Sequence, residues 1–244
     1  YAENAKVHGF VVGISGGIDS AVTSTLCAQT GLKVLCVEMP IHQAANQVSR
    51  GREHIEQLKQ RFSNVSNVET DLTSVFETFK KVVPSSEDEA KLNLSLANTR
   101  ARLRMTSLYY LAGIHGLLVA GTGNKVEDFG VGFYTKYGDG GVDLSPIADL
   151  MKSDVYALGA YLKVPTSILN AAPTDGLFGD DRSDEDQLGA SYDELEWAML
   201  SDEAGKTSND FSGRQKEVFA IYKRLNKSNQ HKMNPIPVCL VHRD

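Results

Sequence analysis

The first half of the chain alternates between short apolar runs and longer segments in which apolar residues have helical spacing. The short runs predict buried strands at residues 10–14, 33–39, 65–72 and 117–120. The longer segments predict helices at residues 20–30, 47–62, 72–82 and 92–115. Strands that alternate with helices favour a parallel sheet covered on both faces. The expected fold class is therefore α/β, a doubly wound, Rossmann-like open parallel sheet flanked by helices.

The second half of the chain has weaker patterning. Residues 129–143 are rich in glycine and predict a loop, whereas residues 150–162 predict a helix. Two sequences with the spacing of a capping box begin at Ser191 and at Ser212, and they predict two further helices. Nothing divides the chain by composition, so we expect a single domain over residues 1–244.

Polar segments without a core pattern predict irregular chain in this half of the sequence. They cover residues 173–187 and 201–211, and composition alone places His231 and Lys232 in a polar C-terminal tail.

Composition excludes several function classes. The net charge of -6 argues against a general nucleic-acid binder, which usually has a basic face. The three cysteines form no Cys-x-x-Cys pair, so no zinc site is indicated, and Cys27 and Cys36, which lie in apolar segments, are expected to be reduced core residues. No stretch is long and apolar enough to span a membrane, and no leader pattern opens the sequence, so a cytoplasmic location is expected.

A glycine-rich turn lies between the first predicted strand and the first predicted helix. It comprises Gly13, Ile14, Ser15, Gly16, Gly17, Ile18, Asp19 and Ser20. Glycine lets backbone N–H groups turn toward phosphate, and a helix N-terminus adds a favourable dipole. Glycine at such a turn is often there for sterics alone, but the whole string in this place favours an ATP site. The string is not a Walker loop, which needs Gly-x4-Gly-Lys-Ser/Thr.

A second turn, residues 121–124, follows the fourth predicted strand. Ligands bind beyond the carboxyl ends of parallel strands, so this turn, the glycine-rich turn and the turn at Met39 should converge on one crevice, with the Thr122 hydroxyl beside the glycines. Glu127 lies three residues beyond the turn. Mg²⁺ on a nucleotide takes one or two carboxylates plus phosphate oxygens, and Asp19 and Glu127 supply that number. A plain strand-ending turn with an exposed acid is the alternative.

Basic and aromatic residues in the middle of the chain are further candidates for ligand binding. Arg100, Arg102 and Arg104 alternate along a predicted helix, so only one would face the crevice, where its guanidinium could hold a phosphate or carboxylate. The glycine and aromatic residues at 133–143 suggest closure over a ligand, with rings that stack on a heterocycle. Lys152 begins a helix, where the dipole disfavours a cation, so an anionic partner is expected.

These stretches together resemble the ammonia-dependent NAD synthetases of the PP-loop ATP pyrophosphatase group. The matching residues run in order through nearly the whole chain: residues 13–20, 101–105, 121–124 and 133–143, Ser145-Pro146, Lys152, Pro173-Thr174 and His231-Lys232. The resemblance implies an adenine nucleotide alpha-hydrolase-like fold and a C–N bond-forming ligase, an NAD synthase. It also implies a homodimer with the dinucleotide at the interface, and two mobile loops near residues 81–92 and 202–214.

The resemblance also implies roles for individual residues. ATP contacts fall on residues 13–20 and on Met39, Thr122, Lys152 and Thr174. Asp19, Ser15, Ser20 and Lys152 are expected to act in catalysis. Asp19 and Glu127 are expected to hold Mg²⁺ as cofactor. Deamido-NAD contacts fall on Arg102, Lys136, Asp143, His231 and Lys232.

The sequence departs from the family pattern in two places. The segment 127–136 is one residue longer than in some members, and residues 39–43 match the pattern after the second strand only loosely.

The implied reaction uses ATP, deamido-NAD and ammonia and gives NAD, AMP and pyrophosphate. A carboxylate is unreactive toward ammonia, so it first becomes an adenylate, and the loop and Mg²⁺ hold the departing pyrophosphate. No cysteine arrangement indicates a glutaminase, so ammonia is the expected nitrogen donor.

Two alternatives are open, one from the same superfamily and one from another class. A GMP synthetase-like or tRNA-modifying enzyme of the same superfamily would share the first loop, but a tRNA enzyme should have a basic face. A non-catalytic adenine-nucleotide-binding module would leave Asp19 and Glu127 without a role.

Overall fold

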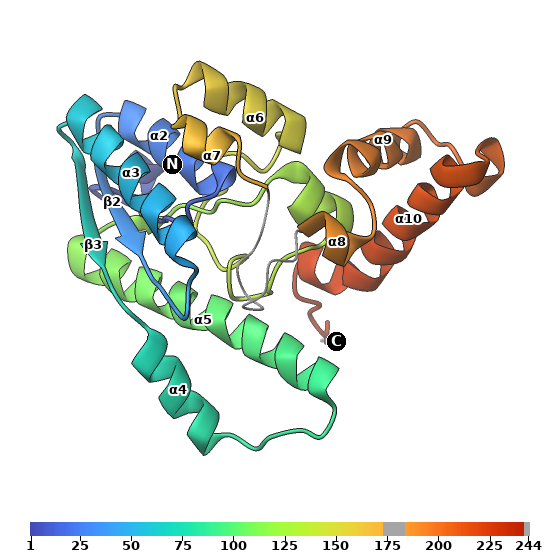
Figure 1. The fold of residues 1–244 in the computed structure, drawn as a ribbon, viewed down its shortest axis with the longest axis horizontal. Coiled ribbons are helices and arrows are strands. Elements are labelled where there is room, and N and C mark those ends of the chain that lie inside the picture. The colour runs from blue at the N-terminus through green and yellow to red at the C-terminus, as the bar shows by residue number, and fades with distance from the viewer. Residues whose placement is uncertain (173–183, 242–244) are drawn as a thin grey trace.

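The computed structural model describes residues 1–172 and 184–241, and within them four parallel strands form one sheet (Figure 1). The strands are β1 (Gly9–Gly13), β2 (Lys33–Glu38), β3 (Val65–Glu69) and β4 (Leu118–Val119). Their order across the sheet is β3-β2-β1-β4, so the chain winds to one side of β1 and then returns to its other side. The loop after β1 therefore lies at the topological switch point, where open α/β sheets bind ligands.

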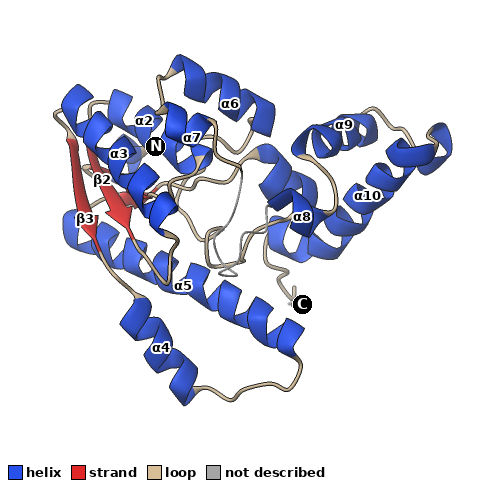
Figure 2. Ribbon diagram, in the orientation of Figure 1, coloured by secondary structure: helices blue, strands red, loops and turns tan. Residues whose placement is uncertain are grey.

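Helices account for most of the remaining described chain (Figure 2). The α-helices are α1 (Ala2–Ala5), α2 (Ile18–Gln29), α3 (Ala45–Arg61), α4 (Thr73–Val82), α5 (Glu89–His115), α6 (Lys152–Tyr161), α7 (Thr166–Leu169), α8 (Asp184–Leu188), α9 (Tyr192–Glu203) and α10 (Gly213–Met233). A π-helical turn, η1 (Val126–Val131), and a 3-10 turn, η2 (Ser208–Asp210), complete the set. Among the described residues, no helix combines the length and the apolar character needed to cross a bilayer.

Alternate residues of β1 enter two different cores, one on each face of the sheet. Phe10 and Val12 pack with side chains of α2 and α3, including Leu58. Val11 packs on the opposite face with α4 and α5, through Phe76 and Ala112 among others. The period of two in side-chain direction along a strand explains this division. The doubly wound α/β class predicted from the sequence is confirmed.

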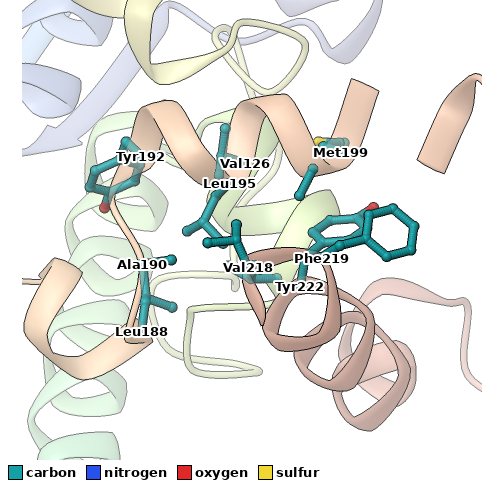
Figure 3. Close-up of a cluster of buried hydrophobic side chains, with 11 residues drawn as sticks. Val126, Leu188, Ala190, Tyr192, Leu195, Met199, Val218, Phe219 and Tyr222 are labelled. Carbon is teal, nitrogen blue, oxygen red and sulfur yellow. The ribbon is translucent and has the colours of Figure 1, made fainter. Parts of the chain in front are cut away.

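A separate helical core lies away from the sheet, where α9 and α10 pack beside η1 (Figures 1 and 3). Its members include Val126 of η1, Leu195 of α9 and Val218 of α10, all fully buried. Burial of this kind stabilises by roughly 25 cal/mol per Å² of apolar surface. The helical core therefore fixes η1, and with it Glu127, relative to α9.

Most predicted strands and helices are confirmed to within a few residues, but three sequence-based assignments were wrong. Residues 184–187 were predicted to be irregular, yet they belong to α8. Residues 129–143 were predicted to be a loop throughout, yet residues 126–131 form the π-helical turn. A π-helix spans one more residue per hydrogen-bonded turn than an α-helix, so its apolar spacing differs from the helical period sought in the sequence. His231 and Lys232 were placed in a polar tail, yet they occupy the last turn of α10.

The two capping boxes had different outcomes. Ser191 and Glu194 form the predicted box, with Glu194 N donating to Ser191 Oγ and Ser191 N donating to Glu194 Oε2. Ser212 is the residue before α10, but its side chain caps no helix N–H.

Candidate active site

The glycine-rich turn joins β1 to α2 and holds its shape through its own serines. Ser15 Oγ lies 3.1 Å from Ser20 Oγ and accepts a hydrogen bond from Gly17 N at 3.2 Å. Gly16 has a φ of 81°, and a Cβ there would collide with the carbonyl oxygen of Gln47 in α3. Only glycine fits this position, because α3 approaches the turn so closely.

The N-terminus of α2 points its free N–H groups out of this turn. Gly17 is the N-cap residue and no side chain caps the helix. The unpaired donors of a first helical turn, together with the helix dipole, favour an anion such as phosphate. The sequence-predicted anion site is thus matched by the backbone geometry.

Lys152 connects the two predicted metal-ligand carboxylates. Its Nζ donates to Asp19 Oδ2 at 2.7 Å and to Glu127 Oε1 at 3.0 Å. The Lys152 side chain is only 4% exposed. Asp19 belongs to α2, Glu127 to η1 and Lys152 to the first turn of α6. Three elements therefore bring their charges to one point beside the glycine-rich turn.

The charges at this point depend on one another. Burial lowers the pKa of Lys152, but Asp19 and Glu127 outweigh it and raise that pKa above its ordinary value. Burial raises the pKa of Glu127, but Lys152 and Tyr192 outweigh it and lower that pKa. The two carboxylates therefore favour the charged form of the Lys152 ammonium.

Sequence reasoning missed three polar residues of the site. Tyr192 donates from its hydroxyl to Glu127 Oε1 at 2.6 Å, and this hydroxyl lies 3.3 Å from Asp184 Oδ2. Asn124 is fully buried; its Nδ2 donates to Asp19 Oδ1 at 3.0 Å, and its Oδ1 accepts from Glu127 N. Tyr192 lay within the predicted capping box at residues 191–194, so nothing local indicated its contact with Glu127. Asn124 lay within the predicted turn.

The π-helical turn adds a further carboxyl to this region, at Asp128. Its carboxyl lies so close to Gly123 that a Cβ on Gly123 would overlap it. Burial, followed by the charges of Glu127, Asp139 and Asp19, raises the pKa of Asp128 to about 7. Segment 127–136, which is one residue longer than in some family members, thus contains a second buried acid close enough to interact with Glu127.

A cavity of about 260 Å³ opens at the carboxyl ends of the strands. It is lined by predicted ATP contacts at Gly13, Ile14, Ser15, Asp19, Ser20, Met39 and Thr122, and by Glu127. A smaller hollow of about 60 Å³ lies on the other side of the same turn and is lined by Gly16, Gly17, Ile18 and Lys152. The described members of the predicted ATP set therefore converge as expected. Thr174 lies outside the described residues.

The residues predicted to contact deamido-NAD lie outside this cavity. Arg102 donates to the Lys136 carbonyl at 3.3 Å, and Lys136 Nζ donates to the His231 carbonyl. Lys232 donates to the carbonyls of Gly132 and Tyr134. Asp143 is apart from this group, since it accepts from Val119 N and from Tyr109. The structure thus brings four of the five together through the segment 132–136, and places Asp143 beside β4 and Tyr109 of α5.

A glycine-rich anion site at the switch point of a doubly wound sheet, with a buried lysine between two carboxylates, defines a nucleotide-binding enzyme of the α/β class. The family model described as NAD synthase matches residues 1–236. The chain belongs to this family, so the resemblance seen in the sequence is confirmed.

Individual relatives agree with this assignment. The chain is 37% identical to the NH(3)-dependent NAD(+) synthetase of Mesoplasma florum, over 95% of this chain and 88% of that protein. Among solved structures, it is similar to the NMN synthetase of Francisella tularensis with a TM-score of 0.82 and 30% identity, covering 97% of this chain and 91% of that one. It is also similar to the NH3-dependent NAD synthetase of Campylobacter jejuni, with a TM-score of 0.76 and 27% identity over 98% and 93% of the two chains.

Proposed function

We propose that this protein catalyses the ATP-dependent amidation of deamido-NAD by ammonia, which gives NAD, AMP and pyrophosphate. The observation that carries the proposal is the Lys152 ammonium held between Asp19 and Glu127, at the edge of the glycine-rich turn and its cavity. Curated relatives that cover most of the chain have the same activity in their names.

The proposed chemistry has two steps. A carboxylate oxygen of deamido-NAD attacks the α-phosphorus of ATP, the bond to the β-phosphate oxygen breaks, and pyrophosphate leaves. The nitrogen of ammonia then attacks the acyl carbon, the carbon–oxygen bond to AMP breaks, and a proton leaves the nitrogen. In the first step, the N–H groups of residues 13–20 and the Lys152 ammonium would neutralise charge on the departing pyrophosphate.

The residues at the site fit Mg²⁺ bound together with a nucleotide. Asp19 and Glu127 already share a cation, Lys152, and their oxygens are the ligand type that Mg²⁺ prefers. No group of three or more His, Cys, Asp or Glu side chains in the described ranges is arranged to hold a metal alone. Phosphate oxygens and water would therefore supply the remaining ligands. Bound Mg²⁺ would stabilise negative charge on the phosphates.

Product analysis tests the proposal directly. Purified protein with ATP, Mg²⁺, ammonium and deamido-NAD should release NAD, AMP and pyrophosphate in equal amounts, measured by chromatography. Release of ADP and phosphate would contradict the adenylation step.

Nicotinate mononucleotide belongs in the same assay as a second candidate substrate. The specific reason is the similarity to a solved structure described as an NMN synthetase. The substrate with the higher kcat/KM identifies the activity, and a xanthine nucleotide serves as the negative control.

The residues gathered around segment 132–136 are proposed to bind the second substrate: Arg102, Lys136, His231 and Lys232. None of these four residues lines the ATP cavity. The proposal therefore includes the homodimer that the family resemblance implies, in which a second copy of the chain completes this site. Sedimentation equilibrium should give the mass of two chains.

Arg102→Ala should raise the KM for deamido-NAD about tenfold or more and leave the KM for ATP near its original value. A hydrogen bond from a charged group is worth about 1.5–3 kcal/mol, and this guanidinium lies outside the ATP cavity. Steady-state kinetics with each substrate varied in turn measures both constants. Arg61→Ala, at the far end of α3, is the matched control. A larger change in the KM for ATP would refute the assignment.

A further inference from the structure

The carboxylate of Glu38 has no role in the site described so far, although it lies in the same cavity. Glu38 is the last residue of β2 and is in register with Glu69 of β3. It is 7% exposed and lines the cavity that the glycine-rich turn opens into. Because β2 is the direct neighbour of β1, Glu38 lies one strand away from the predicted phosphate-binding backbone.

One oxygen of Glu38 is buried without a hydrogen bond. In the part of the chain that the structure describes, Oε1 has no donor within hydrogen-bonding distance. Arg52 Nε is 3.6 Å away, which is too long for a hydrogen bond, and Arg52 instead donates to Glu69 Oε2 at 2.7 Å. Burial raises the pKa of Glu38, with Arg52 opposing this effect. A buried acceptor inside a ligand cavity is satisfied when the ligand brings its own donor.

The surroundings of Glu38 indicate which donor this is. The glycine-rich turn would hold the phosphates of a nucleotide, and Met39, Val48 and Leu108 give the cavity an apolar wall suited to a base. The ribose of a nucleotide connects these two parts and carries two neighbouring hydroxyl groups. Two hydroxyl donors match the two oxygens of one carboxylate.

The position of Glu38 in the fold supports the same donor. In dinucleotide-binding folds of the doubly wound class, an acid roughly 20 residues after the glycine-rich turn binds ribose hydroxyls. Glu38 follows the turn at about that spacing and at the end of the adjacent strand.

We propose that Glu38 binds the ribose hydroxyls of ATP and makes the protein selective for ribonucleotides over deoxyribonucleotides. The inference rests on the proposed function in one respect, that ATP occupies this cavity. It does not depend on the identity of the substrate that is amidated. Arg52, bound to Glu69, keeps a positive charge beside Glu38 and favours its ionised form.

Calorimetric titration of the full chain tests the proposal in the absence of any substrate to be amidated. ATP, 2′-deoxyATP and 3′-deoxyATP are titrated with Mg²⁺ present. The wild-type protein should bind each deoxynucleotide about 10- to 100-fold more weakly than ATP, because a charged acceptor loses its donor. Glu38→Ala should bind all three nucleotides with similar, weak affinity. Glu38→Gln keeps an acceptor oxygen and should retain part of the preference.

Glu56→Gln is the matched control, because Glu56 is 60% exposed on α3, pairs with Lys59 and lies outside the lining of the cavity. It should keep the wild-type preference. Equal binding of ATP and both deoxynucleotides by the wild-type protein would overturn the proposal, as would loss of the preference in Glu56→Gln but not in Glu38→Ala or Glu38→Gln.

Inosine triphosphate separates ribose from base recognition. If the Glu38 variants change the ratio of ATP to inosine triphosphate affinity and leave the ribose preference intact, Glu38 binds the adenine amino group and the proposal is wrong. If folded wild-type protein binds no ATP, the proposed function fails together with this proposal. If it binds ATP without a preference for the ribose hydroxyls, only the proposal for Glu38 fails.

Discussion

Replacing Lys152 with methionine is expected to lower the free energy of unfolding by about 3–5 kcal/mol at neutral pH and to abolish turnover. The substitution keeps the length of the side chain but leaves Asp19 and Glu127 facing each other without a cation. Removing one partner of a buried ion pair typically has this cost, because the charge that remains is uncompensated. Turnover is lost because the same ammonium is proposed to neutralise phosphate.

Urea-induced unfolding and product formation measure the two effects. Lys125→Met is the matched control, since Lys125 is partly exposed and lies 3.5 Å from Glu203 and 3.8 Å from Asp149. An exposed pair of this kind contributes under about 1 kcal/mol. Unchanged stability in Lys152→Met would mean that the buried pair does not hold α6 to the site.

Replacing Asp19 with asparagine should reduce kcat by at least about 10²–10³-fold while the protein stays folded. The loss of a preorganised electrostatic group in an active site commonly has this size. The fold is expected to survive because Lys152 keeps Glu127 as a partner. In the wild-type protein, ATP with Mg²⁺ should raise Tm more than ATP alone, and this difference should disappear in Asp19→Asn.

Asp149→Asn is the control for Asp19→Asn, because the Asp149 side chain is fully exposed. It should match the wild-type protein in kcat and in the Mg²⁺-dependent rise in Tm. Full activity in Asp19→Asn would remove Asp19 from the metal and phosphate chemistry.

The sheet and the phosphate site could be predicted from the sequence because their signals are local. A buried strand, a glycine-rich turn and a helix occur within residues 9–29, and parallel strands bring their carboxyl ends to one edge whatever the details of packing. The convergence of Asp19, Thr122 and Glu127 followed from topology alone.

The rest of the site depends on contacts between distant parts of the chain. Tyr192 reaches Glu127 because α9 packs on η1 in the helical core, and no local pattern predicts that contact. Lys232 belongs to α10 because Val218 and Tyr222 anchor that helix in the same core, while the composition of its last turn is that of a tail. The sequence did not indicate Glu38 as a ligand-binding residue, because an acid at the end of a strand is normally exposed to solvent.

The buried ion pair of Lys152 joins the two cores as well as serving the chemistry. Asp19 is carried by α2, which packs on the sheet, whereas Glu127 is carried by η1, which packs in the helical core. Contact between the two cores therefore includes the same three charged side chains that are proposed to meet the nucleotide. A polyphosphate that attracts the Lys152 ammonium would weaken the contact between the sheet and the helical core. Nucleotide binding would then change how firmly α10, with His231 and Lys232, is held against the rest of the protein.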